Sequence, residues 1–302
     1  LDASVMDASA EPDDDDAYLR APPRGGKSVG HTSVVLKLEL ANGKKAAFKP
    51  ASRRGPGRYK GEIAARRLAV ALGLPNVPRA FPRAFAEAEL LSALGGEASP
   101  AGALVAKEAI ATGGSVRGAL IPWMDDLDFL PLENEPWWSR WRLWLKKGAV
   151  IETDVSLRLG PDGWKGVQAK DVARDASNLV AFDYLTANFD RWSGGNVGWD
   201  RQRRLVLFID NDGAFLEPPQ KEGLARTRRL LEGVDRFSRS FVERLRAMDD
   251  AALSRAVGEE APGAPLLSPK VLAGVAQRRK ELLGVVDAKI QANGEGETLY
   301  FP

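Results

Sequence analysis

The stretch VAFDYLTANFDRWSGGNVGWDRQRRLVLFIDNDGAF, residues 180–215, decides the predicted fold, because it places two aspartates and an asparagine around two apolar segments. The first segment has apolar residues at the spacing of an α-helix, namely Leu179, Phe182, Leu185 and Phe189. This periodicity predicts a helix that ends near Asp190. The Asp190 carboxylate is therefore expected to emerge where the backbone leaves that helix.

The second apolar segment, residues 205–209, is bounded by charged residues and predicts a buried strand. Asp210 follows directly at its carboxyl end, and Asn196 lies in the preceding turn beside two glycines. In kinases one aspartate accepts the proton of the attacking hydroxyl, while an asparagine and a second aspartate hold the metal ions that bridge the phosphates. The order and the types of these residues match a phosphotransfer site.

The composition is that of an ordinary globular protein. At 302 residues, of which 44% are hydrophobic, the chain is long enough for two lobes with sizeable cores. Forty-three basic residues against 41 acidic ones give a formal net charge of +2, so no global field favours nucleic acid or an anionic membrane and no nucleic-acid partner is expected. No apolar run approaches the roughly 18 residues of a membrane-spanning helix, so no transmembrane segment is expected.

Two residue types are scarce enough to exclude whole classes of site. The chain has no cysteine, which excludes disulfides, cysteine nucleophiles and cysteine-ligated zinc. A Ser-His-Asp hydrolase would have to use the single histidine, His31, and no nucleophile elbow lies near it. Histidine-rich metal clusters are excluded as well.

The first part of the chain is predicted to be mostly sheet. Residues 33–49 alternate apolar and polar side chains around Asn42-Gly43, a pair that favours a tight hairpin turn. Residues 104–110 and 118–123 are interpreted as two further strands. One helix is expected over residues 61–72.

The rest of the chain is predicted to be mostly helical, which completes an α+β fold of the bilobal, protein-kinase-like type. Helical spacing of apolar residues recurs over residues 230–248 and 272–290. The first residues carry a run of aspartates that repel one another and bury nothing. The expected domains are an acidic disordered tail (1–20), a β-rich N-lobe (21–122), a helical C-lobe (123–291) and a linker or tag-like tail (292–302).

A lysine and a glutamate upstream complete the kinase pattern. Lys49 ends the second hairpin strand in AAFKP, and Glu62 lies near the start of the following helix. In kinases such a pair fixes an ammonium group against the α- and β-phosphates. Taken singly, Lys49 is also explained as a solvated strand end, and Glu62 as an acid favoured by the helix dipole.

Together these segments resemble the four-jointed type of secretory-pathway atypical kinases, which carry an FKP strand, an EIAA helix and an FDYLTANFDR catalytic segment. The resemblance covers most of residues 33–215 as ordered motifs. A more distant likeness extends to HipA-like kinases and to type II phosphoinositide 4-kinases. The implied roles are phosphate binding by Lys49, its positioning by Glu62, base catalysis by Asp190 and metal binding by Asn196 and Asp210.

Two features depart from the usual kinase pattern. Five residues lie between Asp190 and Asn196, one more than kinases usually have. The segment expected to cover the phosphates, KSVGHTS at residues 27–33, has no GxGxxG pattern. Its candidate nucleotide-binding residues are Gly30 and Ser33, through backbone N–H groups and hydroxyls.

Two further clusters have alternative interpretations. Four tryptophans recur at helical spacing in residues 137–144, and packing is favoured over stacking on a sugar or peptide. Seven arginines surround the apolar stripe of residues 226–246. They are interpreted as solvated helix faces, with a footprint for an acidic substrate or nucleic acid as the alternative.

The resulting hypothesis is a kinase that uses ATP with Mg²⁺ or Mn²⁺ and transfers the γ-phosphoryl group to a hydroxyl. The family resemblance makes Ser or Thr of a protein substrate the first expected acceptor. A sugar or lipid kinase, and a pseudokinase binding module without turnover, are the alternatives. An exported or secreted location follows from the resemblance, with a cytoplasmic one as the alternative.

Overall fold

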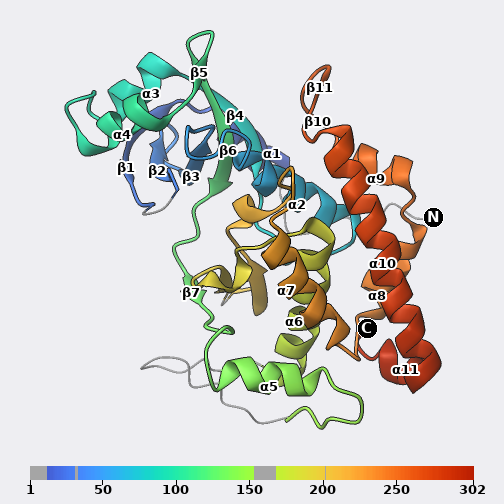
Figure 1. Cartoon of the computed structure of the whole chain (residues 1–302). Coiled ribbons are helices and arrows are strands. Elements are labelled where there is room, and N and C mark those ends of the chain that lie inside the picture. Colours follow the sequence, from blue (N-terminus) through green and yellow to red (C-terminus); the bar gives the residue numbers. More distant parts are fainter. Residues whose placement is uncertain (1–11, 31–32, 153–167, 201) are drawn as a thin grey trace. The chain divides into compact units, whose positions relative to one another are not determined.

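The computed structural model describes residues 12–30, 33–152, 168–200 and 202–302 (Figure 1). The chain divides into two compact units. The first comprises Leu1–Ile63 and Arg79–Met124, and the second comprises Ala64–Pro78 and Asp125–Pro302. The division passes through helix α2 (Tyr59–Ala71) and assigns the segment after this helix to the second unit.

The first unit is built on an antiparallel six-stranded sheet in the order β1-β2-β3-β6-β4, with β5 paired to β6 (Figure 1). Its strands are β1 (Pro23–Ser28), β2 (Leu36–Leu40), β3 (Lys45–Pro50), β4 (Phe81–Ala86), β5 (Ala111–Thr112) and β6 (Ser115–Pro122). Its helices are α1 (Pro12–Arg20), α3 (Glu87–Ala93), α4 (Pro100–Glu108) and the first turn of α2.

The predicted hairpin is confirmed in β2 and β3, which pair with Leu36 opposite Phe48. Gly43 takes a φ of 82°, a left-handed conformation that glycine adopts without steric cost in a tight turn. Leu36, Leu38 and Phe48 are fully buried and belong to one core cluster. The alternating pattern of the sequence therefore places one face of the hairpin in the core.

One predicted strand is wrong, because most of residues 104–110 lie in helix α4. Ser99 caps this helix by accepting a hydrogen bond from the Gly102 N–H at 2.9 Å, and Pro100 occupies its first turn. Val105 is buried in the same core cluster as the hairpin. The start signals of a helix thus outweigh an apolar run that also suits a strand.

The acidic segment differs from the expected disordered tail, because residues 12–20 form helix α1. Tyr18 is buried in the core cluster of the sheet, and its ring stacks on Phe81 with 6.2 Å between the centroids. Burial of this ring, a hydrogen bond from Asn42 Nδ2 to the Ala17 carbonyl at 2.9 Å and an ion pair between Arg79 and Asp15 hold the helix despite its run of like charges. The expectation for residues 1–11 falls outside the described residues.

The second unit is mostly helical. Its helices are the remainder of α2, α5 (Trp137–Trp144), α6 (Ala169–Thr186), α7 (Lys221–Glu232), α8 (Arg239–Ala247), α9 (Asp250–Val257), α10 (Pro269–Asn293) and α11 (Glu295–Thr298). A three-stranded antiparallel sheet consists of β7 (Leu127–Phe129), β8 (Val197–Asp200) and β9 (Leu205–Phe208). Its shorter elements are the 3₁₀ helices η2 (Arg191–Ser193) and η3 (Asn211–Gly213) and the strands β10 (Glu259–Ala261) and β11 (Ala264–Pro265).

Helix α6 is buried along most of its length and packs against α7, α10 and β9. It ends at Thr186, earlier than the apolar stripe predicted, because Ala187 takes a left-handed φ of 54°. The predicted helix over residues 272–290 is confirmed within α10. Residues 230–248 instead contribute to two helices, α7 and α8, separated by a short irregular segment.

The last residues differ from the expected linker or tag-like tail, because residues 292–302 pack into the second unit. They include helix α11, and Phe301 has 1% of its surface exposed. The Phe237 N–H donates to the Thr298 carbonyl at 2.7 Å, and the Arg239 N–H donates to the Phe301 carbonyl at 2.8 Å. Apolar burial and backbone hydrogen bonds together hold this segment in place.

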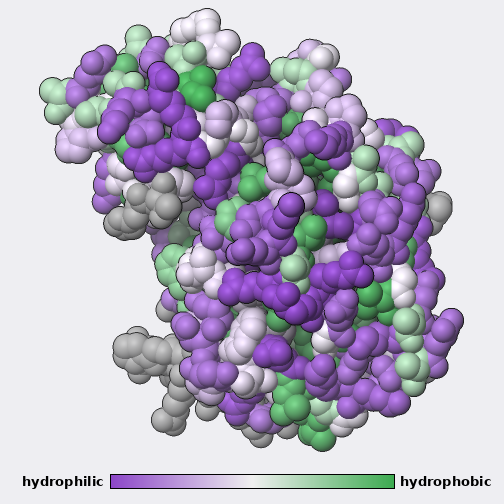
Figure 2. Space-filling view, in the orientation of Figure 1, coloured by the Kyte–Doolittle hydropathy of each residue, from purple (hydrophilic) through white to green (hydrophobic). Residues whose placement is uncertain are grey.

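Within the described residues, no helix is both long and apolar enough to cross a membrane. Figure 2 shows a surface dominated by hydrophilic residues, with hydrophobic ones in small groups. Among the described residues, the large hydrophobic side chains that stay exposed are Val70, Phe129, Leu143 and Val150.

Candidate active site

In the first unit the structure brings Lys49 and Glu62 together. The Lys49 Nζ lies 2.5 Å from Oε1 of Glu62, and the two side chains are 10% and 5% exposed. Lys49 projects from β3, and Glu62 lies in the first turn of α2. A buried charge requires a partner, so this pair is not the solvated strand end that was the alternative explanation of Lys49.

A glycine on the neighbouring strand makes this arrangement sterically feasible. Strand β6 pairs with β3, and Gly118 lies opposite Pro50. A Cβ atom at Gly118 would lie 2.4 Å from the Lys49 carbonyl oxygen and 2.7 Å from the Phe48 ring. Strand β6 can therefore approach the backbone of Lys49 only without a side chain at this position.

The candidate phosphate loop connects β1 to β2. The Gly30 N–H donates to the Val35 carbonyl at 3.3 Å, and a Cβ atom at Gly30 would lie 2.2 Å from the Ser33 carbonyl oxygen. The Gly30 N–H is thus used inside the loop. His31 and Thr32 fall outside the described residues, and nucleotide binding by Gly30 and Ser33 stays a prediction.

In the second unit Asp190 follows the end of α6. The Phe215 N–H donates to the Thr186 carbonyl at 2.9 Å, and the Asp190 N–H donates to Asn188 Oδ1 at 3.1 Å. These bonds turn the chain out of the helix. The Asp190 side chain is half-buried, and its carboxylate makes no hydrogen bond or ion pair with the described residues. Such a carboxylate, positioned through its backbone, is suited to accept a proton from a bound hydroxyl.

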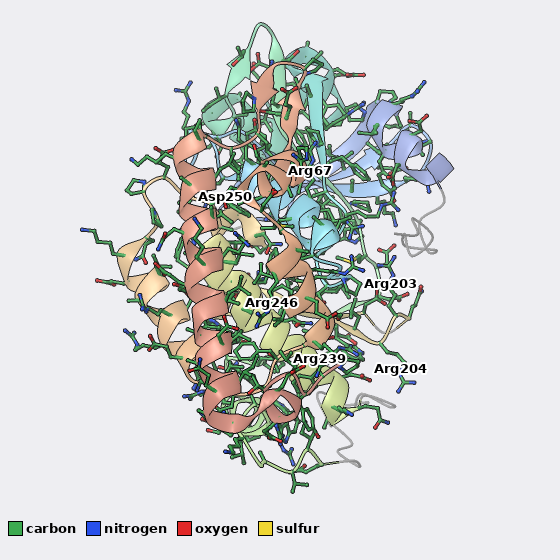
Figure 3. The ribbon with its side chains drawn as sticks, turned by 90° about the vertical axis from the view of Figure 1, so that its right-hand side faces the viewer. Arg67, Arg203, Arg204, Arg239, Arg246 and Asp250 are labelled. Carbon is green, nitrogen blue, oxygen red and sulfur yellow. The ribbon has the colours of Figure 1, made fainter. Side chains whose placement is uncertain are left out.

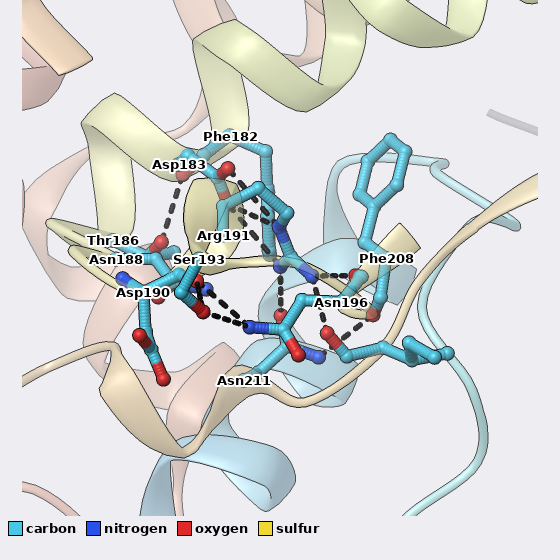
Figure 4. Close-up of polar contacts among 11 residues, drawn as sticks. Phe182, Asp183, Thr186, Asn188, Asp190, Arg191, Ser193, Asn196, Phe208 and Asn211 are labelled. Atoms are coloured by element: carbon cyan, nitrogen blue, oxygen red, sulfur yellow. Dashed lines mark hydrogen bonds and ion pairs between the residues drawn. The ribbon is translucent and has the colours of Figure 1, made fainter. Parts of the chain in front are cut away.

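The next residue, Arg191, lies at the centre of a buried polar network that the sequence analysis missed (Figure 4). Its Nε lies 3.1 Å from Oδ2 of Asp183 on α6. Its Nη1 donates to the Asn196 carbonyl at 2.5 Å and also to the Ile209 carbonyl, and its Nη2 donates to Asn211 Oδ1 at 2.7 Å. One guanidinium group therefore joins the helix, the loop after it and the end of β9.

Asp183 balances the charge of Arg191. The aspartate is 1% exposed, and burial raises the pKa of its carboxyl group to about 6, while the Arg191 guanidinium opposes this shift. Removing one partner of such a pair leaves an unpaired buried charge, which costs about 3–5 kcal/mol. The signal in the sequence was an aspartate among the apolar residues of a helix, eight positions before an arginine.

Asn196 is held in one orientation. Its Nδ2 donates to the Asp190 carbonyl at 2.7 Å and to Ser193 Oγ at 3.2 Å. Gly194 and Gly195 have φ values of 107° and 73°, so glycine conformations accommodate the additional residue of this loop. The remaining Oδ1 is an oxygen ligand of the kind that Mg²⁺ and Mn²⁺ accept.

Asp210 begins the turn after β9, and it takes a left-handed conformation with a φ of 55°. This conformation is costly for most side chains, is better tolerated by aspartate, and concentrates at functional sites. Gly213 ends the same turn, and a Cβ atom there would lie 2.9 Å from the Cβ of Asp190. The turn that begins with Asp210 therefore lies directly beside Asp190.

Asp210 and Asn196 offer hard oxygen ligands on segments that Arg191 joins. Among the described residues, no group of three or more carboxylates or histidines forms a metal site of its own. Kinases hold Mg²⁺ with one or two protein side chains, and substrate phosphates and water complete the coordination. The ligands present here fit a metal ion that arrives together with a nucleotide.

A second buried network holds β9, and no sequence pattern indicated it. Asp175 on α6 accepts a hydrogen bond from the Val206 N–H at 3.1 Å. Asn76 donates from Nδ2 to the Val206 carbonyl at 2.8 Å, and the backbone carbonyl of Asn76 accepts from the Phe208 N–H at 2.8 Å. Burial raises the pKa of Asp175 to about 6, and the neighbouring Arg174 opposes the shift. These bonds fix the strand that leads to Asp210.

The packing role expected for the tryptophans is confirmed. Trp137, Trp141 and Trp144 on α5 are buried. The Trp141 ring stacks on Trp192, with 5.4 Å between centroids and 11° between planes. Trp192 lies in η2, directly after Arg191. Helix α5 therefore supports the loop that carries Asp190.

A scan of protein-family models and a search of curated proteins found no match. Among solved structures, the chain is similar to a Golgi casein kinase, solved alone and with Mn/ADP bound. Each of these two structures has a TM-score of 0.65 and 18% sequence identity to this chain, and each match covers 94% of this chain and 77% of the other. It is also similar to hydra Fam20 with sugar, with a TM-score of 0.66 and 20% identity, covering 94% of this chain and 90% of the other. The expected α+β fold is confirmed: the chain has the kinase-like fold of these atypical kinases.

Proposed function

We propose that the chain is an ATP-dependent kinase that transfers the γ-phosphoryl group to a hydroxyl. The observation that carries this proposal is a buried network on a kinase-like fold: Arg191 donates to the carbonyls of Asn196 and Ile209, and the Asn196 side chain donates to the Asp190 carbonyl. The buried Lys49–Glu62 pair adds the cation that a nucleotide requires. The Golgi casein kinase solved with Mn/ADP supports ATP and a divalent metal ion as the cofactors.

The residues have separate roles in this mechanism. The Lys49 ammonium, held by Glu62, binds oxygens of the α- and β-phosphates. The Asp210 carboxylate and Asn196 Oδ1 would hold the metal ions, which would neutralise phosphate charge. Asp190 accepts the hydroxyl proton as the acceptor oxygen bonds to the γ-phosphorus, while the bond from that phosphorus to its bridging oxygen breaks and ADP leaves.

The proposed acceptor is Ser or Thr of a protein. One structural neighbour is named a casein kinase, which supports a protein acceptor. Hydra Fam20 was solved with sugar, so a sugar hydroxyl is the alternative acceptor. The Golgi origin of the first neighbour supports an exported location.

The test is incubation of the full chain with labelled ATP, Mg²⁺ or Mn²⁺, and a panel of proteins, sugars and lipids. We expect metal-dependent transfer to a protein, and much slower transfer from the Asp190→Asn variant. Metal-dependent nucleotide binding without transfer to any acceptor would instead identify a pseudokinase. Absence of nucleotide binding under all these conditions would refute the proposal.

A further inference from the structure

A cavity of about 250 Å³ lies in the second unit, between α5 and the end of α7. Trp141, Leu145, Leu230 and Val234 form an apolar part of its lining. Leu143 lines the same cavity and has 62% of its surface exposed. Sites for small molecules usually measure about 300–1,000 Å³, so this cavity suits one apolar side chain better than a nucleotide.

The same cavity is lined by three cations, Arg142, Lys146 and Arg229. None of them makes an ion pair within the described part of the chain, and no described acidic residue lines the cavity. The Arg142 guanidinium lies 5.0 Å from the centroid of the Trp138 ring, and Lys146 Nζ donates to the Gly233 carbonyl at 2.6 Å. An apolar cavity is thus bordered by three cations, of which Lys146 also interacts electrostatically with Asp235, and this excess of positive charge favours an acidic partner.

Two other arginines of this region, Arg226 and Arg244, also make no ion pair within the described residues, but neither lines the cavity. Arg228, Arg239 and Arg246 each pair with a carboxylate, and Arg236 is buried against Glu297. Figure 3 labels Arg239 and Arg246, which both belong to α8. These four pair with acidic side chains, whereas Arg229 makes no ion pair within the described residues and lines the cavity.

The cavity is also connected to the proposed catalytic loop. Trp141, which lines it, stacks on Trp192. Trp192 follows Asp190 by two residues. A segment bound in the cavity is therefore held by the element that supports the proposed base.

We propose that this cavity docks an acidic segment of a protein acceptor. One Leu- or Phe-like side chain enters the cavity, and flanking Asp or Glu residues pair with Arg142, Lys146 and Arg229. The apolar lining favours a protein over nucleic acid, since phosphate backbones gain nothing from it. This inference rests on the proposed function and identifies its acceptor as an acidic protein.

The first experiment measures binding of fluorescein-labelled peptides to the full chain by anisotropy, without ATP. One peptide carries a leucine between glutamates, a second replaces the leucine by serine, and a third replaces the glutamates by glutamines. We expect the first to bind roughly tenfold more tightly than either of the others, because both an apolar anchor and charge complementarity contribute. Equal binding of the first two peptides would leave only a charged surface and overturn the proposal.

The second experiment uses charge-reversal variants. Arg229→Glu should weaken binding of the first peptide roughly tenfold, whereas Arg226→Glu, an exposed position on the same helix outside the cavity, should not. Melting temperatures check that both variants fold. Equal losses in both variants would overturn the proposal, as would dimers of the chain that compete with the peptide.

A kinetic measurement separates this inference from the proposed function. Arg229→Glu should raise KM for a protein acceptor that carries the acidic segment and leave kcat unchanged. If the peptide binds but no acceptor is phosphorylated, the proposed function fails and docking stands. If phosphate is transferred with the same KM by wild type and Arg229→Glu, docking fails and the proposed function stands.

Discussion

Charge is buried in both units, but in two different ways. In the first unit Lys49 on a strand pairs with the carboxylate of Glu62 on a helix. In the second unit Arg191 donates to two side chains and two backbone carbonyls, and its side chain is fully buried. The first pair places one cation, whereas the second network determines the path of the chain. We therefore expect activity to depend on both, and the folded state to depend mainly on the second.

The largest expected effect follows removal of Arg191. Arg191→Met leaves Asp183 buried without its charged partner, and it removes donors from two backbone carbonyls. We expect a loss of about 3–5 kcal/mol of unfolding free energy, together with loss of transfer. Urea denaturation measures the first quantity, with Arg203→Met as the control because that side chain is 47% exposed. Similar midpoints for both variants would contradict a structural role.

Asp190 tests the opposite extreme, in which chemistry changes and stability does not. Asp190→Asn keeps the shape of the side chain and removes the proton acceptor, so transfer should slow by about 10²- to 10⁴-fold. Single-turnover rates at saturating ATP and Mn²⁺ report this step apart from binding. Asp171→Asn, on the first turn of α6, should leave the rate unchanged. A wild-type rate in folded Asp190→Asn would refute the proposed mechanism.

The Lys49–Glu62 pair should show an intermediate pattern. Lys49→Met removes the ammonium group proposed to bind the phosphates, and it leaves Glu62 buried without that ammonium group. Both the transfer rate and the melting temperature should therefore fall. The loss of stability is partly offset because Glu62 lies at the start of α2, where acidic residues are favoured. We therefore expect a loss of about 1–3 kcal/mol of unfolding free energy. The double variant Lys49→Met with Glu62→Gln should recover stability and not activity. Recovery of both would show that Lys49 has no role in transfer.

The smallest expected effect is a pH dependence that originates in Asp175. Its pKa is about 6 in the folded chain, above the ordinary value of 3.8, so the native state binds this proton more tightly than the unfolded state. The stability that this proton contributes is fully present below about pH 3.8 and is lost as the pH rises through about 6. Asn at position 175 does not titrate, so the Asp175→Asn variant does not lose stability in this way as the pH rises. Its urea midpoint relative to that of wild type should therefore rise between pH 4 and 7. A constant difference over this range would show that Asp175 stays ionised.

Several features of this protein could be predicted from local sequence. The hairpin around Gly43, the strand before Asp210 and the helix before Asp190 follow from periodicity and turn residues, which act between near neighbours. Lys49 and Glu62 also lie on the predicted strand and helix. The kinase-like order of these residues could therefore be recognised without a structure.

Other features were decided only by the tertiary structure, because their contacts join residues far apart in the sequence. Tyr18 and Phe301 gain apolar burial that composition does not reveal, and this burial converts two expected tails into packed segments. Asn76 bonds to Val206, 130 residues away, and no local pattern encodes that contact. Arg191 looks like an ordinary cation in the sequence, whereas in the fold it pairs with Asp183 and bridges to β9. Local periodicity determined the elements of this protein, and long-range burial decided which polar groups hold them together.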